Sequence, residues 1–222
     1  MAQKLSVAVI GLGNIGTIVA GNLVKGNRPV IVADRSIEKA NKLAQNLGSL
    51  AEPASIADAI QKSDIIILAV WFNTIKELFT TYSTALRGKL IIDPSNPIAP
   101  DEKGGFKKII GKDQSAGEIL NSILPKNARL VKALGTLSAA SLSGAAFQKP
   151  SSAVLFYADD DLSINNDVEQ LIRDNGFEPL RIGGLDQSIR IEAFGDLHEF
   201  GALGKPVTLA QANESLAVHS TN

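Results

Sequence analysis

The chain has 222 residues, 45% of them hydrophobic, and a formal net charge of −1 at pH 7. This length allows one large core, or a core plus a smaller unit, and the near-zero charge argues against a nucleic-acid or anionic-membrane partner. The absence of cysteine excludes disulfides, thiol catalysis and thiolate metal sites, and two histidines leave little to hold zinc or iron.

The N-terminal apolar stretch after Lys4 does not predict a secretory signal. Glycines at positions 11, 13 and 16 interrupt it, and no small-residue cleavage site precedes a polar start. The longest apolar runs, such as Ile65–Phe72, are too short to cross a bilayer. We therefore expect a soluble cytoplasmic protein without a membrane partner.

The run Gly11-Leu12-Gly13-Asn14-Ile15-Gly16 is the most informative motif. It follows the apolar segment Leu5–Ile10 and opens an amphipathic segment, Asn14–Lys25. In a strand-turn-helix unit, such glycines permit the tight turn, the approach of a pyrophosphate and close helix-strand packing. Asp34 ends the next apolar run, roughly 20 residues on, where such units carry the acid that binds a ribose. The motif predicts a nicotinamide dinucleotide site.

Strand-like and helix-like segments alternate along the first 135 residues. The expected strands are Leu5–Ile10, Pro29–Ala33, Ser49–Ala51, Ile65–Val70, Leu90–Ile92 and Arg129–Leu134. The expected helices are Asn14–Lys25, a segment through Ala40 and Leu47 ending at Gly48, one starting at Ser55, Asn73–Tyr82 with Asn73 as N-cap, and one opened by a capping box at Ser115. This alternation predicts an α/β fold, a doubly wound Rossmann parallel sheet.

The remaining residues differ from this pattern and predict a small C-terminal α/β unit. Its expected elements are the strand Ser152–Tyr157, the helix Leu162–Asp174, the strand Glu178–Ile182, the helix Gln187–Phe200 and a loose polar tail from Asn213. We therefore divide the chain into a dinucleotide-binding domain, residues 1–135, and a small domain with its tail, residues 136–222.

Ligands of open α/β sheets bind beyond the carboxyl ends of the strands. After the second strand, Asp34 favours the free ribose of NAD, whereas Arg35, with Ser36 and Lys39 nearby, could clamp the 2′-phosphate of NADP. Asp34 could also simply cap the next helix. The choice between NADP and NAD stays open, with a slight preference for NADP.

Two further strand ends are candidate cofactor contacts. Ala69-Val70-Trp71 includes the single tryptophan, which could shield a nicotinamide or could belong to the core or an interface. Ser95-Asn96-Pro97 could hydrogen-bond the nicotinamide ribose or carboxamide, or could be a plain proline turn. The loop Ile98–Phe106 that follows is long enough to move over a site.

Other polar residues are weaker candidates. Lys132 lies in a strand that otherwise predicts burial, so it needs a partner, a substrate role or a surface edge. Asp159-Asp160-Asp161 precedes a helix, and we expect it to favour the helix dipole rather than bind a metal. His198 is a candidate proton donor or an exposed residue. No residue is assigned as catalytic, and no metal site is expected.

The combination of segments resembles the coenzyme F420 (deazaflavin)-dependent NADP oxidoreductases. The resemblance is carried by Val7–Gly16, Gly88–Pro97, Leu130–Ala133 and Asn175–Pro179, and by Gly183–Asp186 with Arg190 and Glu192. Two departures stand out. The family has a small polar residue where this chain has Asp34, before an arginine matching Arg35, and it commonly has Phe-Asn-Thr where this chain has Leu134-Gly135-Thr136.

The resemblance implies direct hydride transfer between a nicotinamide and coenzyme F420, or a flavin such as FMN or FAD, without a dedicated nucleophile. It also implies a homodimer, for which the apolar segment Gln187–Phe200 is a candidate interface. Two alternatives remain: a reductase of a small carbonyl or imine, with His198, Lys132 or Tyr157 as proton donor, and a non-enzymatic NAD(P)-binding sensor.

Overall fold

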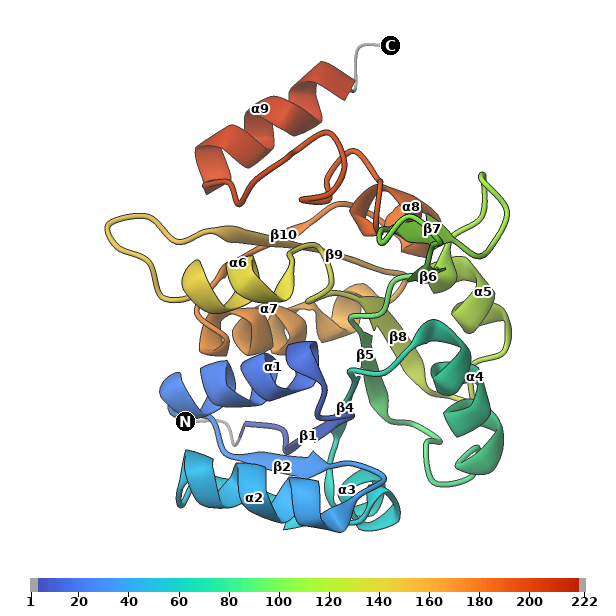
Figure 1. The fold of residues 1–222 in the computed structure, drawn as a ribbon, viewed down its shortest axis with the longest axis vertical. Coiled ribbons are helices and arrows are strands. Elements are labelled where there is room, and N and C mark those ends of the chain that lie inside the picture. The colour runs from blue at the N-terminus through green and yellow to red at the C-terminus, as the bar shows by residue number, and fades with distance from the viewer. Residues whose placement is uncertain (1–3, 220–222) are drawn as a thin grey trace.

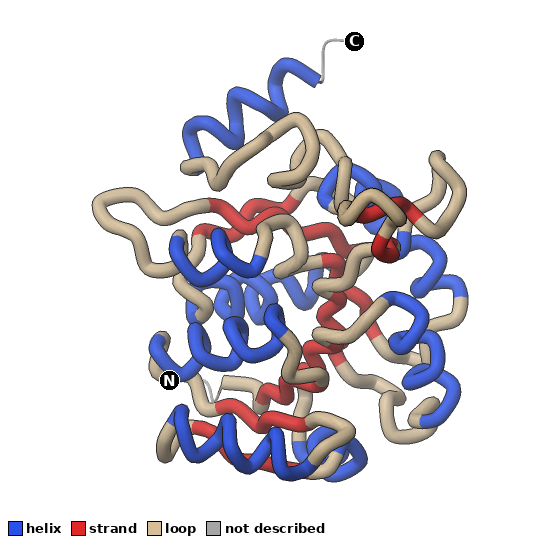
Figure 2. Tube along the Cα trace, viewed as in Figure 1, coloured by secondary structure: helices blue, strands red, loops and turns tan. Residues whose placement is uncertain are grey.

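A computed structural model describes residues 4–219, with side chains through residue 217. Eight strands form one sheet in the order β10-β9-β8-β5-β4-β1-β2-β3 (Figures 1 and 2). They are β1 (Val7–Ile10), β2 (Val30–Ala33), β3 (Ala51–Ala54), β4 (Ile65–Leu68), β5 (Leu90–Asp93), β8 (Arg129–Lys132), β9 (Val154–Asp159) and β10 (Glu178–Arg181). The order from β3 to β8 is that of a doubly wound dinucleotide-binding sheet, so the predicted α/β Rossmann fold is confirmed.

Helices cover both faces of the sheet. They are α1 (Asn14–Lys25), α2 (Ile37–Leu47), α3 (Ile56–Lys62), α4 (Phe72–Thr81), α5 (Ala116–Ser122), α6 (Ala139–Gly144), α7 (Asn165–Asp174), α8 (Ser188–Ile191) and α9 (Leu209–His219), with 3₁₀ turns η1 (Leu162–Ile164) and η2 (Leu185–Gln187). One apolar cluster joins α1, α2, α6 and α7 to one face, and a second joins α3, α4 and α5 to the other.

The central strands form because their apolar runs are buried on both sides. All four residues of β4, from Ile65 to Leu68, have no exposed side-chain surface, as expected of a strand between two helical layers. The helices begin where serines supply caps: Ser55 Oγ accepts from Asp58 N at 3.1 Å, and Ser115 Oγ accepts from Glu118 N at 3.1 Å. Both helix starts were predicted.

Strand β9 runs antiparallel to β8 and extends past its end. The pairs are Val131 with Asp159 and Lys132 with Ala158. The segment Val154–Tyr157 therefore lies beyond the carboxyl end of β8, and this same segment pairs in parallel with β10. Strands β9 and β10 thus extend the sheet past the edge where the carboxyl ends of β1 to β5 and of β8 meet, as Figure 1 shows.

The segment after β10 packs on the remaining face of β9. Its apolar side chains form a third cluster with β9, which contains Val154, Phe156, Ala158, Ile191, Leu197, Val207 and Ala212. The predicted helix Gln187–Phe200 is wrong: only Ser188–Ile191 is α-helical, and Glu192 is extended at φ −87° and ψ 163°. The Glu192 carboxylate bonds to α5, and that tertiary contact ends the helix.

Several other element boundaries differ from the prediction. Strand β3 starts at Ala51, the N-cap of α4 is Trp71 rather than Asn73, and β8 stops at Lys132 because Leu134 has a φ of +65°. The loop after Pro97 contains a hairpin of β6 (Ile98–Pro100) and β7 (Phe106–Lys108). Helix α6 was not predicted.

The predicted loose tail from Asn213 is wrong as far as residue 219. Helix α9 continues there, and Ala212 on it is fully buried in the third cluster. The last part of the predicted tail, residues 220–222, lies outside the described residues. Within residues 4–219, no helix combines the length and the apolar character needed to span a membrane.

Candidate functional site

The glycine turn joins β1 to α1 at the carboxyl edge of the sheet. Gly11 has a φ of +92°, and a Cβ there would lie 2.6 Å from the carbonyl oxygen of Ala69. A Cβ on Gly16 would lie 1.8 Å from the carbonyl oxygen of Gly11. A Cβ on Gly13, in contrast, would meet no protein atom within 4 Å. Two glycines are thus required by the chain itself, and the third leaves space open above the turn.

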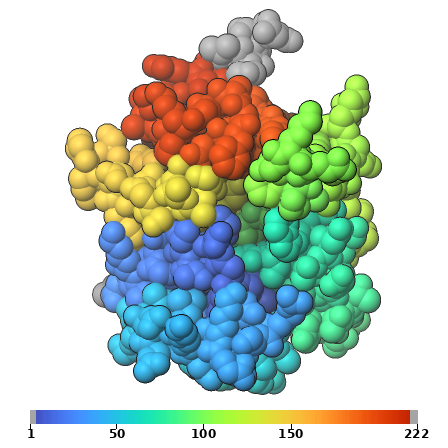
Figure 3. Space-filling model, in the orientation of Figure 1, coloured from blue at the N-terminus to red at the C-terminus, as the bar shows by residue number. Residues whose placement is uncertain are grey.

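The N-terminus of α1 faces this space. Gly13 is the N-cap and supplies no side chain, and no side chain in the described part of the protein caps the helix. The amides of the first turn, together with the helix dipole, form an environment suited to an anion. A cavity of about 570 Å³ opens beside them. It is lined by Leu12, Gly13, Asn14, Thr17, Ile18, Lys39, Ala139, Ala140 and Ser143. In Figure 3 the yellow surface of α6 lies directly above the blue surface of α1.

Asp34 at the end of β2 braces the glycine turn. Its Oδ2 accepts from Leu12 N at 2.8 Å and lies 3.5 Å from Lys39 Nζ, while Oδ1 accepts from Ser36 N at 3.3 Å. Burial raises the pKa of Asp34, but the hydrogen bonds from Leu12 and Ser36 and the charge of Lys39 outweigh it and lower the pKa below its usual value. The carboxylate is therefore ionised and already bonded to the protein.

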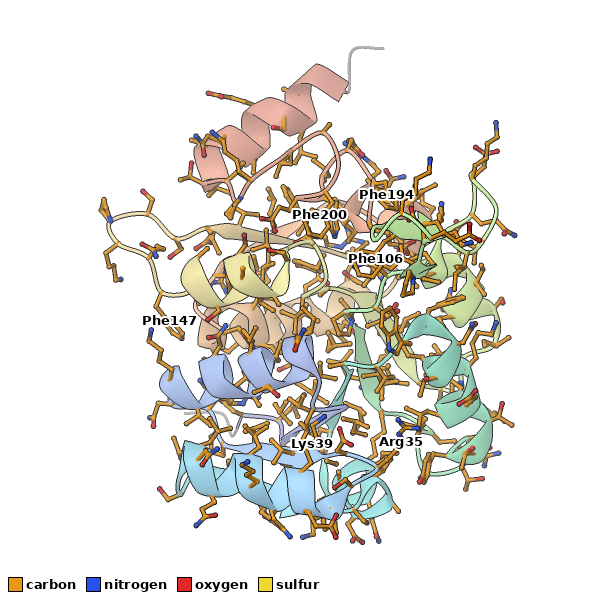
Figure 4. The ribbon with its side chains drawn as sticks, in the orientation of Figure 1. Arg35, Lys39, Phe106, Phe147, Phe194 and Phe200 are labelled. Atoms are coloured by element: carbon orange, nitrogen blue, oxygen red, sulfur yellow. The ribbon has the colours of Figure 1, made fainter. Side chains whose placement is uncertain are left out.

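The residues after Asp34 expose positive charge. The Ser36 hydroxyl caps α2 by accepting from Lys39 N at 3.2 Å, and it donates to Glu38 Oε2 at 2.8 Å. Arg35 is exposed, and the side chain of Lys39 is half-exposed. Figure 4 shows both at the start of α2. Lys39 thus lines the cavity beside the glycine turn, and Arg35 lies just before the same helix.

The turn after β4 packs directly on the glycine turn. Ala69 N donates to Ile10 O at 2.8 Å. A Cβ on Gly11 would lie only 2.4 Å from Val70 Cγ1. Trp71 is the N-cap of α4 and leaves 58% of its surface exposed. The single tryptophan is therefore on the surface at this edge and does not belong to the core of the described chain.

The Asn96 side chain holds two other segments together. Its Nδ2 donates to Gly135 O at 3.1 Å, and its Oδ1 accepts from Ala193 N at 2.6 Å. Asn96 thus connects the end of β5 to the end of β8 and to the segment 192–200, which we name the C-terminal strap. Pro97 beside it is buried.

Two buried hydroxyls lie at the same strand ends without partners. Ser95 is 6% exposed and Thr136 is 2% exposed, and within residues 4–219 neither Ser95 Oγ nor Thr136 Oγ1 makes a hydrogen bond. A buried polar atom without a partner is costly and often marks a site for a ligand or a water. Thr136 was not selected as a site residue from the sequence.

Lys132 is at the centre of a buried charge cluster below this edge. Its Nζ lies 2.8 Å from Asp93 Oδ2 and 4.0 Å from Glu192 Oε1, and it also donates to Ser95 O. The Glu192 carboxylate accepts from Ala116 N and Gly117 N at 3.0 Å each. Burial raises the pKa of Glu192, and Lys132 and the two amides only partly oppose this. Lys132 is therefore neither a surface residue nor open to a substrate.

The C-terminal strap is fixed at its far end as well. His198 is 1% exposed, its Nε2 lies 3.0 Å from Gly135 O, and its Nδ1 accepts from Phe200 N at 2.9 Å. Burial lowers the pKa of His198 to about 4. Glu199 accepts from Ser138 N and from the Ser141 hydroxyl, both at 2.5 Å, at the start of α6.

The three candidate proton donors are all buried. Tyr157 has no exposed surface and donates to Glu169 Oε1 at 3.1 Å, and burial raises its pKa well above the usual value. Lys132 and His198 are 2% and 1% exposed. None of the three faces the cavity beside the glycine turn.

The acidic run after β9 is occupied by the protein itself. Asp159 pairs with Arg181 Nε at 3.0 Å, Asp160 accepts from Leu185 N at 2.8 Å, and Asp161 accepts from Ser163 N at the start of η1. Across the described residues, no group of three or more histidine and acidic side chains could hold a metal ion.

Comparison with known proteins agrees with the resemblance seen in the sequence. Residues 6–97 match the family model described as NADP oxidoreductase, coenzyme F420-dependent. The chain is 27% identical over 187 residues to the metalloreductase STEAP3 of Rattus norvegicus; this covers 84% of the chain but 36% of that protein. The chain thus spans about a third of the length of this relative.

Solved structures share the fold over most of the chain. A hypothetical protein, SMa0349 of Sinorhizobium meliloti, superposes with a TM-score of 0.79 and 27% identity, covering 92% of this chain and 95% of that one. A candidate F420-dependent NADP reductase of Arthrobacter sp. FB24 superposes with a TM-score of 0.71 and 20% identity, covering 83% and 87%. Residues 6–97 thus match an NADP-dependent oxidoreductase family.

Proposed function

We propose that this chain, whose residues 6–97 match the NADP oxidoreductase family, transfers a hydride between NADP(H) and a flavin or deazaflavin-type partner. The observation that carries the proposal is the open glycine turn. Gly13 leaves space above an uncapped helix N-terminus, and Lys39 lines the cavity beside it. This is the chemistry that a dinucleotide phosphate requires.

Three groups of residues would hold the dinucleotide. The amides of Gly13-Asn14-Ile15-Gly16 at the start of α1 would bind the pyrophosphate, while the Leu12 amide is bonded to Asp34, and Arg35 and Lys39 would bind the 2′-phosphate. The strand ends Ala69–Trp71 and Ser95–Pro97 would adjoin the nicotinamide half, where the Ser95 and Thr136 hydroxyls have no partner among the described residues. When bound, the nicotinamide supplies the hydride chemistry, while the protein binds, orients and excludes water.

The bonding of Asp34 supports NADP over NAD. A carboxylate pointing freely at the cofactor would repel a 2′-phosphate, but Asp34 is bonded to Leu12 N and lies beside Lys39. Lys39 thus offsets the charge of Asp34, and Arg35 is exposed next to them. We expect NADPH to bind more tightly than NADH.

The burial of the candidate proton donors supports a partner that accepts a hydride without one. A carbonyl or imine reductase needs an acid within reach of the new bond. His198 is neutral near pH 7 because its pKa is about 4, and Tyr157 and Lys132 are bonded within the protein. A ring such as that of FMN, FAD or coenzyme F420 can be reduced by hydride transfer alone. We also propose that the protein is cytoplasmic, because its apolar runs predict neither a secretory signal nor a membrane span. We propose a homodimer because the family resemblance implies one.

The first experiment measures cofactor choice by calorimetry. Arg35→Ala and Lys39→Ala should each weaken NADPH binding about ten-fold or more and leave NADH binding unchanged, because a charge-assisted hydrogen bond contributes about 1.5–3 kcal/mol. Lys42→Ala, an exposed lysine on the same helix, is the matched control and should change neither. Equal affinity of the wild type for both cofactors would contradict the NADP assignment.

The second experiment measures the hydride partner. The NADPH-loaded protein is mixed in a stopped-flow instrument, without oxygen, with FMN, FAD, coenzyme F420, and small carbonyls and imines. Loss of absorbance at the reduced nicotinamide band with one of the flavin-type compounds supports the proposal. Oxidation only by a carbonyl or imine would establish the reductase alternative, and tight NADPH binding with no oxidation by any compound would establish a sensor.

A further inference from the structure

Phe194 has a conformation and an exposure that neither packing nor backbone preference explains. Its φ is +74°, in the left-handed region that side chains other than those of glycine, asparagine and aspartate rarely occupy. Its side chain is 51% exposed, between the buried residues Ala193 and Leu197. A large apolar side chain at such a position does not stabilise the core and strains the backbone.

The other residues with positive φ make this contrast clear. Besides glycines, five described residues have positive φ: Asn27, Asn127, Leu134, Phe147 and Phe194. The two asparagines are exposed, and asparagine tolerates this conformation well. Leu134 is fully buried in the core, and Phe147 packs against Gly176 and under Lys25. Only Phe194 combines the strained conformation with an exposed apolar side chain.

The strained conformation is imposed by hydrogen bonds on both sides. Ala193 N donates to Asn96 Oδ1 at 2.6 Å, and Gly195 N donates to Glu192 O at 2.8 Å. Leu197 N donates to the carbonyl oxygen of Arg190 at 2.8 Å and closes the turn. The backbone at Phe194 is thus held in the left-handed conformation, and strain of this kind is concentrated at functional sites.

The turn lies at the carboxyl edge of the sheet. Asn96 connects it directly to the end of β5, next to Ser95 and its unpartnered hydroxyl. Two more exposed aromatic side chains belong to segments connected to the same strand ends: Phe106, on the hairpin after Pro97, and Phe200, whose amide donates to His198. Figure 4 labels Phe106, Phe194 and Phe200, which all lie in the part of the view above Arg35 and Lys39.

We propose that Phe194 is the stacking face for the planar ring of the hydride partner, a tricyclic ring of the flavin type. This inference rests on the proposed function and assigns the partner's binding residue. A phenylalanine offers a flat π-face and no hydrogen bond, so it selects for a planar aromatic ring rather than for a small carbonyl compound. The C-terminal strap presents this face to a ring bound beyond the ends of β5 and β8.

The test separates binding from folding by the choice of substitution. Phe194→Asn suits the left-handed backbone, so it should keep or raise the thermal midpoint and leave NADPH affinity unchanged. It should weaken the binding of FMN, measured by fluorescence quenching in the presence of NADP⁺, by about five-fold or more, since an aromatic stack contributes on this scale. Phe194→Tyr should retain FMN binding.

Leu162→Asn is the matched control, because Leu162 is 67% exposed on η1, on a different element. It should leave FMN binding unchanged. A Phe194→Asn variant that loses thermal stability but binds FMN like the wild type would overturn the inference and leave the proposed function standing. If the wild type binds neither FMN nor FAD nor coenzyme F420, the proposed function itself fails.

Discussion

Replacement of Lys132 by methionine tests the buried charge cluster. Methionine keeps the apolar stem of the lysine and removes the ammonium that lies 2.8 Å from Asp93 and 4.0 Å from Glu192. All three side chains are 2% exposed or less, so water cannot replace the lost charge. Breaking one partner of a buried ion pair typically costs about 3–5 kcal/mol. We expect a loss in this range, which is a large part of a typical stability of about 5–15 kcal/mol.

The assay is urea unfolding followed by circular dichroism. The midpoint should fall while the slope with urea stays constant, since the surface exposed on unfolding does not change. The matched control is Lys62→Met, which removes a lysine paired with Glu52 at 2.6 Å with both side chains more than half exposed. Its midpoint should equal that of the wild type within error, because exposed pairs contribute little.

The pH dependence gives a second readout of the same cluster. Burial raises the pKa of Glu192 in the folded protein, so the folded state binds its proton more tightly than the unfolded state does. Protonated Glu192 therefore stabilises the folded state at pH values below its pKa in the unfolded chain. This stabilisation is lost as the pH rises through the pKa of Glu192 in the folded protein. Without Lys132 the folded pKa rises further, so Lys132→Met should lose less stability at pH 5 than at pH 8. Equal losses at both pH values, or a loss no larger than that of Lys62→Met, would refute the reasoning.

The geometry also predicts the outcome of four other substitutions. Gly13→Ala should leave the urea midpoint unchanged, because its Cβ meets no protein atom within 4 Å, but should weaken NADPH binding about ten-fold or more in calorimetry. Gly16→Ala should unfold at much lower urea, because its Cβ would lie 1.8 Å from a main-chain oxygen of the turn; wild-type behaviour in either variant would contradict the role given to that glycine. Burial lowers the pKa of His198 to about 4, so the wild type should lose stability as pH falls from about 6.5 towards 4, by up to about 1.4 kcal/mol per pH unit, and His198→Gln should lack this slope in thermal unfolding against pH. Arg28→Met should cost up to about 3 kcal/mol in urea unfolding, because Arg28 Nη1 bonds at 2.8 Å to the buried carboxylate of Asp174, which keeps Lys4 and Gln170 as partners; a change near zero would contradict this role of Arg28.

The parts of the fold that the sequence predicted are those governed by local rules. The buried run of β4 and the serine caps at Ser55 and Ser115 depend on periodicity and on contacts three residues apart. The glycine turn was recognisable because Gly11 and Gly16 each have a steric reason within a few residues of chain or at the adjacent strand end. Signals of this kind are visible in one segment at a time.

The parts that were not predicted depend on contacts between distant segments. The helix expected at Gln187–Phe200 ends at Glu192 because that carboxylate bonds to amides of α5, more than seventy residues earlier in the chain. The position of Lys132 in a buried strand indicated that it needs a partner. The sequence could not identify Asp93 and Glu192 as the partners. Asn96 was predicted to contact the cofactor, and the sequence could not show that its amide bonds two distant protein segments.

Strand β9 continues past the carboxyl end of β8, and this extra length separates the C-terminal strap from the other strands. Four residues of β9, Val154–Tyr157, continue past Lys132, which corresponds to roughly 13 Å of strand. Only two residue pairs join β8 to β9, whereas each of the other pairings in the described sheet has three or four. A change of register at this seam would move β10 and the strap by about 3.3 Å per residue. Under the proposed function, such a register change at this one seam would alter the gap between the nicotinamide and its partner ring and leave the pairing of β1, β2 and β3 unchanged.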